Sequence, residues 1–192
     1  MSDRTPTKLI ILDRDGVINH DQESFIKSPE EWVPIEGSLE AIARLNQAGY
    51  CVVVATNQSG VARGLYDLST LNAIHQKMHA ASMMVGAKID AIFFCPHSAK
   101  ENCDCRKPRT GMFQEIAKRY GVNLKGIASV GDSLRDLQAS YLSGCVPYLV
   151  LSGKGQMTLD GGGLPPGTSI FPNLAAMVDK LLTDENPELA IE

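Results

Sequence analysis

Three aspartates, Asp13, Asp15 and Asp132, directly follow short apolar runs of this sequence, where they could bind a metal ion or transfer protons. Asp13 and Asp15 lie two residues apart, directly after the apolar run of residues 8–12. Thr56 and Asp132 each follow another short apolar run further along the chain. Carboxylate oxygens are ligands that Mg²⁺ prefers, and a bound cation keeps a neighbouring carboxylate ionised as a nucleophile. These residues therefore predict a magnesium site beside a reactive carboxylate, if the fold brings them together.

A second group joins three cysteines and one histidine in a short stretch: Cys95, His97, Cys103 and Cys105. Three thiolates and an imidazole are typical ligands of tetrahedral zinc, and four protein ligands leave no open position for a substrate. We therefore predict a structural Zn²⁺ ion that organises the loop of residues 95–108. The ordered loop would place Arg106 and Lys107 at the rim of the predicted active site. Reduced cysteines without a metal are the alternative. Cys51 and Cys145 are expected in the core.

The segments between these residues alternate between strand and helix patterns. Buried strands are predicted at residues 8–12, 50–55, 89–94, 127–130 and 147–151. Helices are predicted between a Ser38 cap and Gly49, and at residues 69–84, 112–120, 134–143 and 174–182. This alternation predicts an α/β fold, a doubly wound parallel sheet sandwich with right-handed crossovers. The carboxyl ends of its strands would bring the candidate residues to one edge of the sheet.

The remaining segments are expected to be irregular within a single domain of residues 1–192. Residues 16–34 are predicted to form a loop in which Trp32 packs against the core. Residues 153–167, rich in glycine and proline, are predicted to form a mobile loop. The acidic tail at residues 184–192 is expected to fray.

Composition excludes several classes of partner. The formal net charge of −4 and a pI near 5.6 disfavour binding to nucleic acid or to an anionic membrane surface. We see neither a transmembrane stretch nor a secretory signal, and five cysteines, an odd number, fit metal ligation in a reducing compartment. We therefore expect a cytoplasmic protein. The sequence does not determine its oligomeric state, although we favour a monomer.

Four motifs then resemble those of the haloacid dehalogenase (HAD) phosphatase superfamily: Asp13-Arg14-Asp15-Gly16, Thr56-Asn57, Lys107 and Gly131-Asp132-x-x-x-Asp136. Residues 12–19, 56–64, 95–97 and 103–108 look like the D-glycero-D-manno-heptose 1,7-bisphosphate 7-phosphatase family, in the histidinol-phosphatase-like subfamily. The resemblance covers about residues 8–154. It implies a Rossmann-like HAD fold, and the short spacings between the motifs leave no room for the cap domains that the superfamily inserts.

The resemblance implies a Mg²⁺-dependent phosphoric monoester hydrolase that acts on a sugar phosphate, in the pathway from heptose bisphosphate to ADP-heptose and lipopolysaccharide. Asp13 is then the nucleophile that forms an aspartyl-phosphate, and Asp15 protonates the leaving oxygen and later activates water. Thr56 and Lys107 hold phosphoryl oxygens, and Mg²⁺ is bound by Asp13, the Asp15 carbonyl and Asp132, with Asp136 acting through water or Lys107. Residues expected to contact substrate are Asp21, Asn57, Gln58, Ser59, Arg63, Arg106 and Ser133.

Two departures from the heptose family's pattern keep a second substrate open. Residues 23–26 read Glu-Ser-Phe-Ile where Gly-Tyr-Val is common, and Ser133 replaces a frequent lysine. Histidinol-phosphate phosphatase is therefore an alternative. Two other classes compete: a phospho-accepting receiver domain, which the adjacent Asp15 disfavours, and a zinc-ribbon binding module, which the missing basic surface disfavours. His75 and His79 are expected on a polar flank of their helix and not at a metal.

Overall fold

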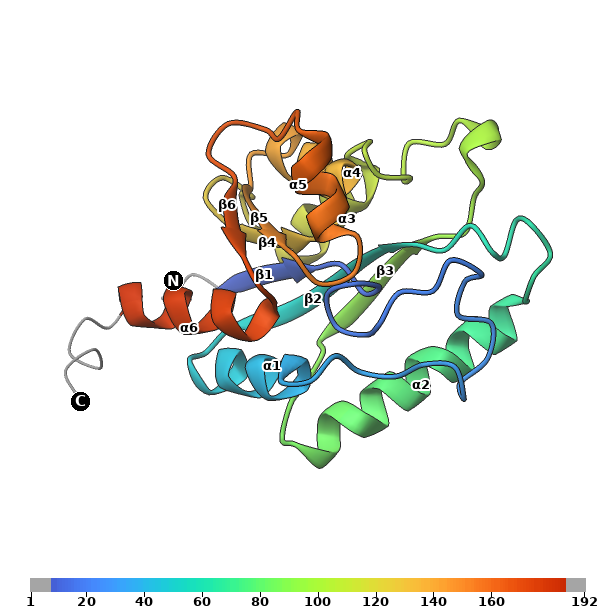
Figure 1. Ribbon diagram of the computed structural model, residues 1–192, viewed down its shortest axis with the longest axis horizontal. Helices are drawn as coiled ribbons and strands as arrows, with labels where there is room; N and C mark the ends of the chain where they lie inside the picture. The colour runs from blue at the N-terminus through green and yellow to red at the C-terminus, as the bar shows by residue number, and fades with distance from the viewer. Residues whose placement is uncertain (1–7, 186–192) are drawn as a thin grey trace.

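The computed structural model describes residues 8–185, and their strands form one six-stranded parallel sheet in the order β3-β2-β1-β4-β5-β6 (Figure 1). The strands are β1 Leu9–Leu12, β2 Cys51–Asn57, β3 Ala91–Cys95, β4 Ala128–Gly131, β5 Val146–Val150 and β6 Ser169–Phe171. The helices are α1 Ser38–Gln47, α2 Leu68–Met84, α3 Gly111–Tyr120, α4 Leu134–Leu142, α5 Gly155–Gly161 and α6 Leu174–Glu185. The predicted α/β class with a parallel sheet is confirmed.

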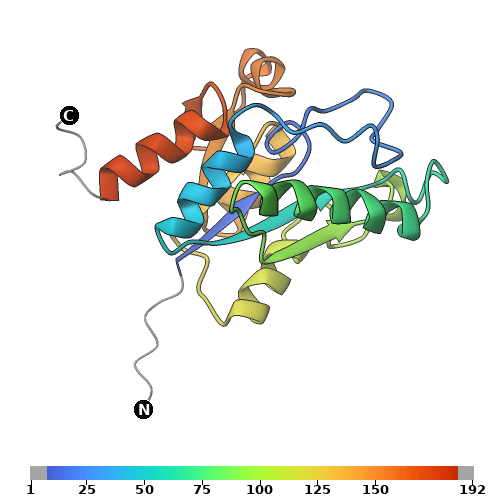
Figure 2. The ribbon, with the colours of Figure 1, turned by 90° about the horizontal axis from the view of Figure 1, so that it is seen from below.

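Helices cover both faces of the sheet because the central strands are apolar on both sides. In β1, Ile10 and Leu12 belong to the core cluster beneath α1, α2 and α6. Leu9 and Ile11 belong to the opposite cluster, which α3 and α4 cover. Figures 1 and 2 show the two helical layers on either side of the sheet. A strand buried on both faces needs no alternation of polar residues, which is why the apolar runs identified it from sequence.

The carboxyl-terminal third differs from the prediction in two elements. Helix α5 lies within the segment of residues 153–167 that was predicted to be a loop, so that prediction is wrong for residues 155–161. Gly155 begins this helix so close to β5 that a Cβ there would lie 1.8 Å from the Val150 carbonyl oxygen. The short edge strand β6, which pairs only with β5 in the sheet order, was not predicted. Its residues are half-buried or exposed, so it lacks the apolar run of the inner strands.

Other loop predictions have mixed outcomes. Trp32 is 1% exposed and packs in the core beneath α1, as predicted. Ser38 does not cap α1: Gly37 occupies the cap position with a φ of 77°, and the Ser38 hydroxyl donates to the Val17 carbonyl. Helix α6 extends through Glu185, and the rest of the predicted frayed tail lies outside the described residues. Among residues 8–185, no helix is both long and apolar enough to cross a membrane.

Candidate active site

A cavity of about 190 Å³ lies at the carboxyl ends of the strands. Asp13 and Asp15 follow β1, Thr56 is the second-last residue of β2, and Asp132 follows β4. All four line the cavity. Parallel strands end at the same edge of a sheet, so residues far apart in the chain meet there. The predicted convergence of these four side chains is therefore present in the structure.

Lys107 lies beneath this cavity as a buried cation. Its Nζ is 3.1 Å from Asp13 Oδ1 and 2.6 Å from Asp136 Oδ1, and it donates to the Ala55 carbonyl at 2.7 Å. Burial alone would lower the pKa of Lys107, but the two carboxylates outweigh it and raise the pKa. The lysine is thus charged and 3% exposed, and it lies behind the lining residues Asp13 and Asp136 and not at the rim as predicted. Arg106, its neighbour, does line the cavity.

The carboxyl groups of the site differ in proton affinity. Burial raises the pKa of Asp13 to about 6, against the lowering effect of Lys107. Burial, with Asp136 and Asp13 nearby, raises the pKa of Asp132 to about 8. Burial also opposes ionisation of Asp15 and Asp136, but their partners outweigh it and the pKa of each is lowered. For Asp15 those partners are the Arg14 charge and hydrogen bonds from Asn19, Gln58 and Arg14.

The carboxylates near Asp132 fit a divalent cation. One oxygen each from Asp13, Asp132 and Asp136 lies within 4.8 Å of the other two. The pKa of Asp132 is raised because the carboxylate is buried beside other carboxylates with too little positive charge nearby. A bound cation would supply that charge. An all-oxygen set of this kind suits Mg²⁺. Because Asp136 also pairs with Lys107, the predicted link between Asp136 and the lysine is present.

Two glycines allow the chain to approach Asp132 closely. A Cβ on Gly16 would lie 2.0 Å from Asp132 Oδ2, and one on Gly153 would lie 2.3 Å from the same atom. The main chain of Lys154 donates to this oxygen at 2.8 Å, and the Thr158 hydroxyl donates to the Asp132 carbonyl at 2.8 Å. The start of the segment predicted as a loop is therefore packed directly against the candidate metal site.

Six of the seven predicted substrate-contacting residues line the cavity: Asp21, Asn57, Ser59, Arg63, Arg106 and Ser133. The amide of Asn57 bonds both main-chain groups of Lys107, at 3.0 and 3.1 Å, so it fixes the lysine's backbone. Ser133 begins α4 in a capping box with Asp136. Asp21 pairs with Lys154 across the cavity at 2.5 Å.

Gln58 is placed differently from the prediction. Its side chain is 2% exposed and does not line the cavity, and its amide bonds Arg14, Asp15, Thr56 and Tyr66 inside the protein. The structure thus places the Gln58 side chain behind the residues that line the cavity, and its contact with substrate stays a prediction. The prediction for His75 is wrong, because its side chain is buried against Arg14 and does not lie on a polar flank of the helix.

Four further residues that line the cavity were not individually predicted to contact substrate: Gln22, Glu23, Phe25 and Arg135. Phe25 adopts a φ of 67°, unusual for a residue with a side chain, and its ring lies 5.3 Å from the Arg63 guanidinium carbon. No sequence pattern predicts a positive φ at a phenylalanine. Arg135 could have been found, because it lies in the first turn of the helix that follows Asp132.

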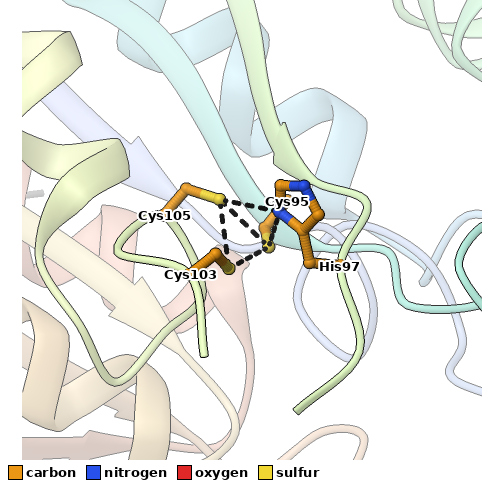
Figure 3. A group of neighbouring side chains, drawn as sticks. All are labelled: Cys95, His97, Cys103 and Cys105. Carbon is orange, nitrogen blue, oxygen red and sulfur yellow. Dashed lines mark hydrogen bonds between the residues drawn. The ribbon is translucent and has the colours of Figure 1, made fainter. Parts of the chain in front are cut away.

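The cysteine group is assembled as its spacing predicted. Cys95 ends β3, and the side chains of His97, Cys103 and Cys105 converge on it (Figure 3). The sulfur atoms lie 3.3–3.6 Å apart, and His97 Nδ1 lies 3.3 Å from Cys105 Sγ. Zinc–sulfur bonds of about 2.3 Å in a tetrahedron separate sulfurs by roughly 3.8 Å, so the group fits Zn²⁺ with a small expansion. Its four protein ligands make this a candidate structural site.

Two family models match the chain. The model described as polynucleotide kinase 3 phosphatase matches residues 8–137, which contain the candidate residues from Asp13 to Asp136. The model described as HAD-hydrolase-like matches residues 104–177. The two matches together include every strand of the sheet.

Curated relatives and a solved structure match over nearly their whole length. The D-glycero-beta-D-manno-heptose-1,7-bisphosphate 7-phosphatase of Bordetella bronchiseptica is 58% identical over 177 residues, 92% of this chain and 99% of that protein. The protein of the same name from Pseudomonas aeruginosa is 53% identical over 91% of this chain and 97% of its own length. A crystal structure of the B. bronchiseptica D,D-heptose 1,7-bisphosphate phosphatase, complexed with magnesium and phosphate, matches with a TM-score of 0.91, 58% identity and coverage of 92% of this chain and 99% of that one.

Proposed function

Since the chain belongs to the haloacid dehalogenase phosphatases, and among them to the family of D-glycero-β-D-manno-heptose-1,7-bisphosphate 7-phosphatases, we propose that it removes the 7-phosphate of this heptose bisphosphate. The observation that carries the proposal is the meeting of Asp13, Asp15 and Lys107 at the carboxyl edge of the sheet. The product would keep its 1-phosphate and serve the supply of ADP-heptose for lipopolysaccharide.

Asp13 attacks the phosphorus in this proposal. Its Oδ1 is held by Lys107 Nζ and by the main-chain N–H of Arg14 at 2.8 Å. Among the described residues, these bonds use Oδ1 alone, which leaves Oδ2 for attack. A bond forms between Oδ2 and phosphorus while the bond from phosphorus to the sugar oxygen breaks, giving an aspartyl-phosphate on Asp13.

Asp15 transfers the proton in both halves of the reaction. Its ionised state is favoured in the free protein, but an incoming phosphoryl group brings negative charge that raises the affinity of Asp15 for a proton. Asp15 gives this proton to the leaving sugar oxygen. It then takes a proton from a water molecule, whose oxygen attacks the aspartyl-phosphate, so that inorganic phosphate leaves and Asp13 is restored.

The remaining residues of the site stabilise the negative charge of the phosphoryl group and orient the substrate. The Lys107 cation lies against Asp13 and limits repulsion between the nucleophile and the phosphoryl oxygens, and Thr56 offers a hydroxyl at the cavity. Mg²⁺ held by Asp13, Asp132 and the Asp15 carbonyl would supply Lewis-acid stabilisation of the phosphoryl charge. Arg63 and Arg106 line the same cavity and suit the second phosphate of a bisphosphate.

The test is phosphate release from a substrate panel with Mg²⁺ present. The panel contains the β and α anomers of heptose 1,7-bisphosphate and histidinol phosphate, and ³¹P NMR identifies which phosphate is lost. We expect loss of the 7-phosphate from the β anomer, with kcat/KM at least about 100-fold above that for histidinol phosphate. Preference for histidinol phosphate would favour the alternative substrate. No release from any of them would overturn the phosphatase assignment.

A matched pair of variants tests the covalent step. Asp13→Asn removes the nucleophile without changing side-chain volume, so turnover is expected to disappear while the fold is retained. Asp160→Asn makes the same change at an exposed position on α5 and is expected to keep full activity. Activity in Asp13→Asn would exclude a covalent intermediate on this residue.

We also propose that the protein works in the cytoplasm as a monomer. The thiols of the candidate zinc group must stay reduced to bind metal, which the cytoplasm allows. Asp13, Asp15 and Lys107, which carry the proposed reaction, meet within a single chain. Light scattering on active protein checks the monomer, and activity confined to a dimer would contradict it.

A further inference from the structure

Arg14 separates the two catalytic aspartates in the sequence, yet its side chain is buried. The Arg14 side chain is 1% exposed, and its guanidinium contacts the Asp15 carboxylate. Arg14 Nε donates to Asp15 Oδ1 at 3.0 Å, and Nη2 donates to Oδ2 at 3.0 Å. Nη2 also lies 2.9 Å from Oδ1, so two nitrogens of a planar group contact both carboxylate oxygens. Such a contact restrains the orientation of the carboxylate more than a point charge does.

Gln58 holds the same carboxylate from the next strand. Its Nε2 donates to Asp15 Oδ2 and to Thr56 Oγ1, each at 2.9 Å. Its Oε1 accepts from Arg14 Nη2 at 3.1 Å and from the Tyr66 hydroxyl at 2.8 Å. One buried amide therefore ties Asp15, which follows β1, to the Thr56 hydroxyl of β2.

His75 on α2 completes the surroundings of the guanidinium. Its Nε2 lies 3.3 Å from Arg14 Nη1. Burial, and then the nearby Arg14 charge, lower the pKa of His75 to about 3, so the ring is neutral and its nitrogen can accept a hydrogen bond. Each branch of the buried guanidinium thus has a partner, and the Arg14 side chain does not line the cavity.

Burying a guanidinium is unfavourable unless it is fully paired, and an apolar side chain could fill the same space more simply. The arrangement instead fixes one side chain that must face the leaving oxygen. We propose that Arg14 and Gln58 are positioning residues that hold Asp15 in its proton-transferring orientation. The inference rests on the proposed proton-transfer role of Asp15, and neither Arg14 nor Gln58 lines the cavity.

The test compares two esters that differ in their need for a proton donor. A sugar phosphate releases an alkoxide and needs the proton, whereas p-nitrophenyl phosphate releases a stable phenolate and needs it little. In Gln58→Met we expect kcat for the sugar phosphate to fall about 100-fold with KM nearly unchanged, and kcat for p-nitrophenyl phosphate to fall less than about tenfold. Gln114→Met, the same change at an exposed position on α3, is expected to leave both rates unchanged.

Two arginine variants separate position from charge. Arg14→Met removes both, and Arg14→Lys keeps the charge but loses the planar fork. We expect the selective loss in both variants, and full recovery in Arg14→Lys would show that charge alone matters and overturn the inference. Gln58→Met keeps side-chain volume without changing charge, so it decides the question if Arg14→Met does not fold, as thermal unfolding will show.

Asp15→Asn distinguishes failure of this inference from failure of the proposed function. The variant should show the same selective loss on the sugar phosphate, more strongly. Equal losses on both esters in Asp15→Asn would contradict its role in proton transfer. A selective loss in Asp15→Asn, with equal or no losses in Gln58→Met and Arg14→Met, would overturn the positioning role alone.

Discussion

The two candidate metal groups of this protein are built in opposite ways. The carboxylate group draws Asp13, Asp132 and Asp136 from two central strands and the helix that follows, more than a hundred residues apart in the chain. The zinc group takes all four ligands from the eleven residues between Cys95 and Cys105. The first group exists because the sheet exists, whereas the second is a local property of one loop.

Their surroundings differ accordingly. Asp132 and Asp136 are buried beside the sheet, and Lys107 supplies a fixed positive charge among them. The zinc group projects beyond β3, and only Cys95 among its ligands is buried in the structure. Loss of metal from the first group should therefore remove activity and leave the fold, while loss from the second should loosen the loop.

The largest expected effect is on turnover in Asp132→Asn. The variant loses a candidate Mg²⁺ ligand, and kcat at saturating Mg²⁺ is expected to fall roughly 100- to 1,000-fold. Stability in EDTA should be equal or higher, because the raised pKa of Asp132 means that its ionised form is disfavoured in the folded protein above about pH 4. Steady-state kinetics and thermal unfolding measure the two effects. A large loss of stability would show that the Asp132 carboxylate supports the fold, as only the zinc group is expected to do.

Cys105→Ser should show the reverse balance. Loss of one of four ligands releases zinc, and we expect about 3 kcal/mol of destabilisation, or roughly 6–12 °C in Tm. Metal analysis should find one zinc per chain in the wild type and none in the variant. Cys51→Ser, outside the group, is the control and should keep its zinc. Full zinc occupancy in Cys105→Ser, or an unchanged Tm without zinc, would refute the structural role.

Sequence reasoning succeeded where one physical rule decides the outcome. Apolar runs such as residues 8–12 can only be strands or short buried segments, and parallel strands bring Asp13, Thr56 and Asp132 to one edge. The four residues of the candidate zinc group were identifiable because their spacing is local. In both cases residue type and position were sufficient, and the side-chain rotamers did not matter.

It failed where tertiary contacts decide. Gln58 is polar and directly follows Thr56 and Asn57, but its amide bonds the buried Arg14 guanidinium and the Asp15 carboxylate. Helix α5 has glycines at both ends and little apolar patterning, so packing against Asp132 and β5, which the sequence does not reveal, holds it in place. β6 is too short and exposed for any periodicity to mark it.

A smaller effect concerns the buried shell behind the carboxylate site. The folded-state pKa of His75 is lowered to about 3, so below about pH 6.5 the unfolded chain binds a proton that the folded protein does not. This contribution to stability is complete above pH 6.5 and is lost as the pH falls, by up to about 1.4 kcal/mol per pH unit. His75→Gln should flatten the fall between about pH 7 and pH 5, measured by urea unfolding. An unchanged slope would mean that His75 is protonated in the folded state.

The smallest expected effect is on Mg²⁺ affinity. It tests whether helix α5 helps to orient Asp132 for metal binding. The Thr158 hydroxyl donates to the Asp132 carbonyl, so helix α5 orients the residue without touching the cavity. Thr158→Val keeps the shape but removes this bond, at a cost of about 1 kcal/mol, and should weaken Mg²⁺ binding roughly tenfold by calorimetry. Thr158→Ser retains the hydroxyl and should bind as the wild type does. Equal affinities in the two variants would mean that Asp132 is held by the Lys154 main chain and the adjacent glycines alone, so the site would be fixed by the sheet and its first loops without help from α5.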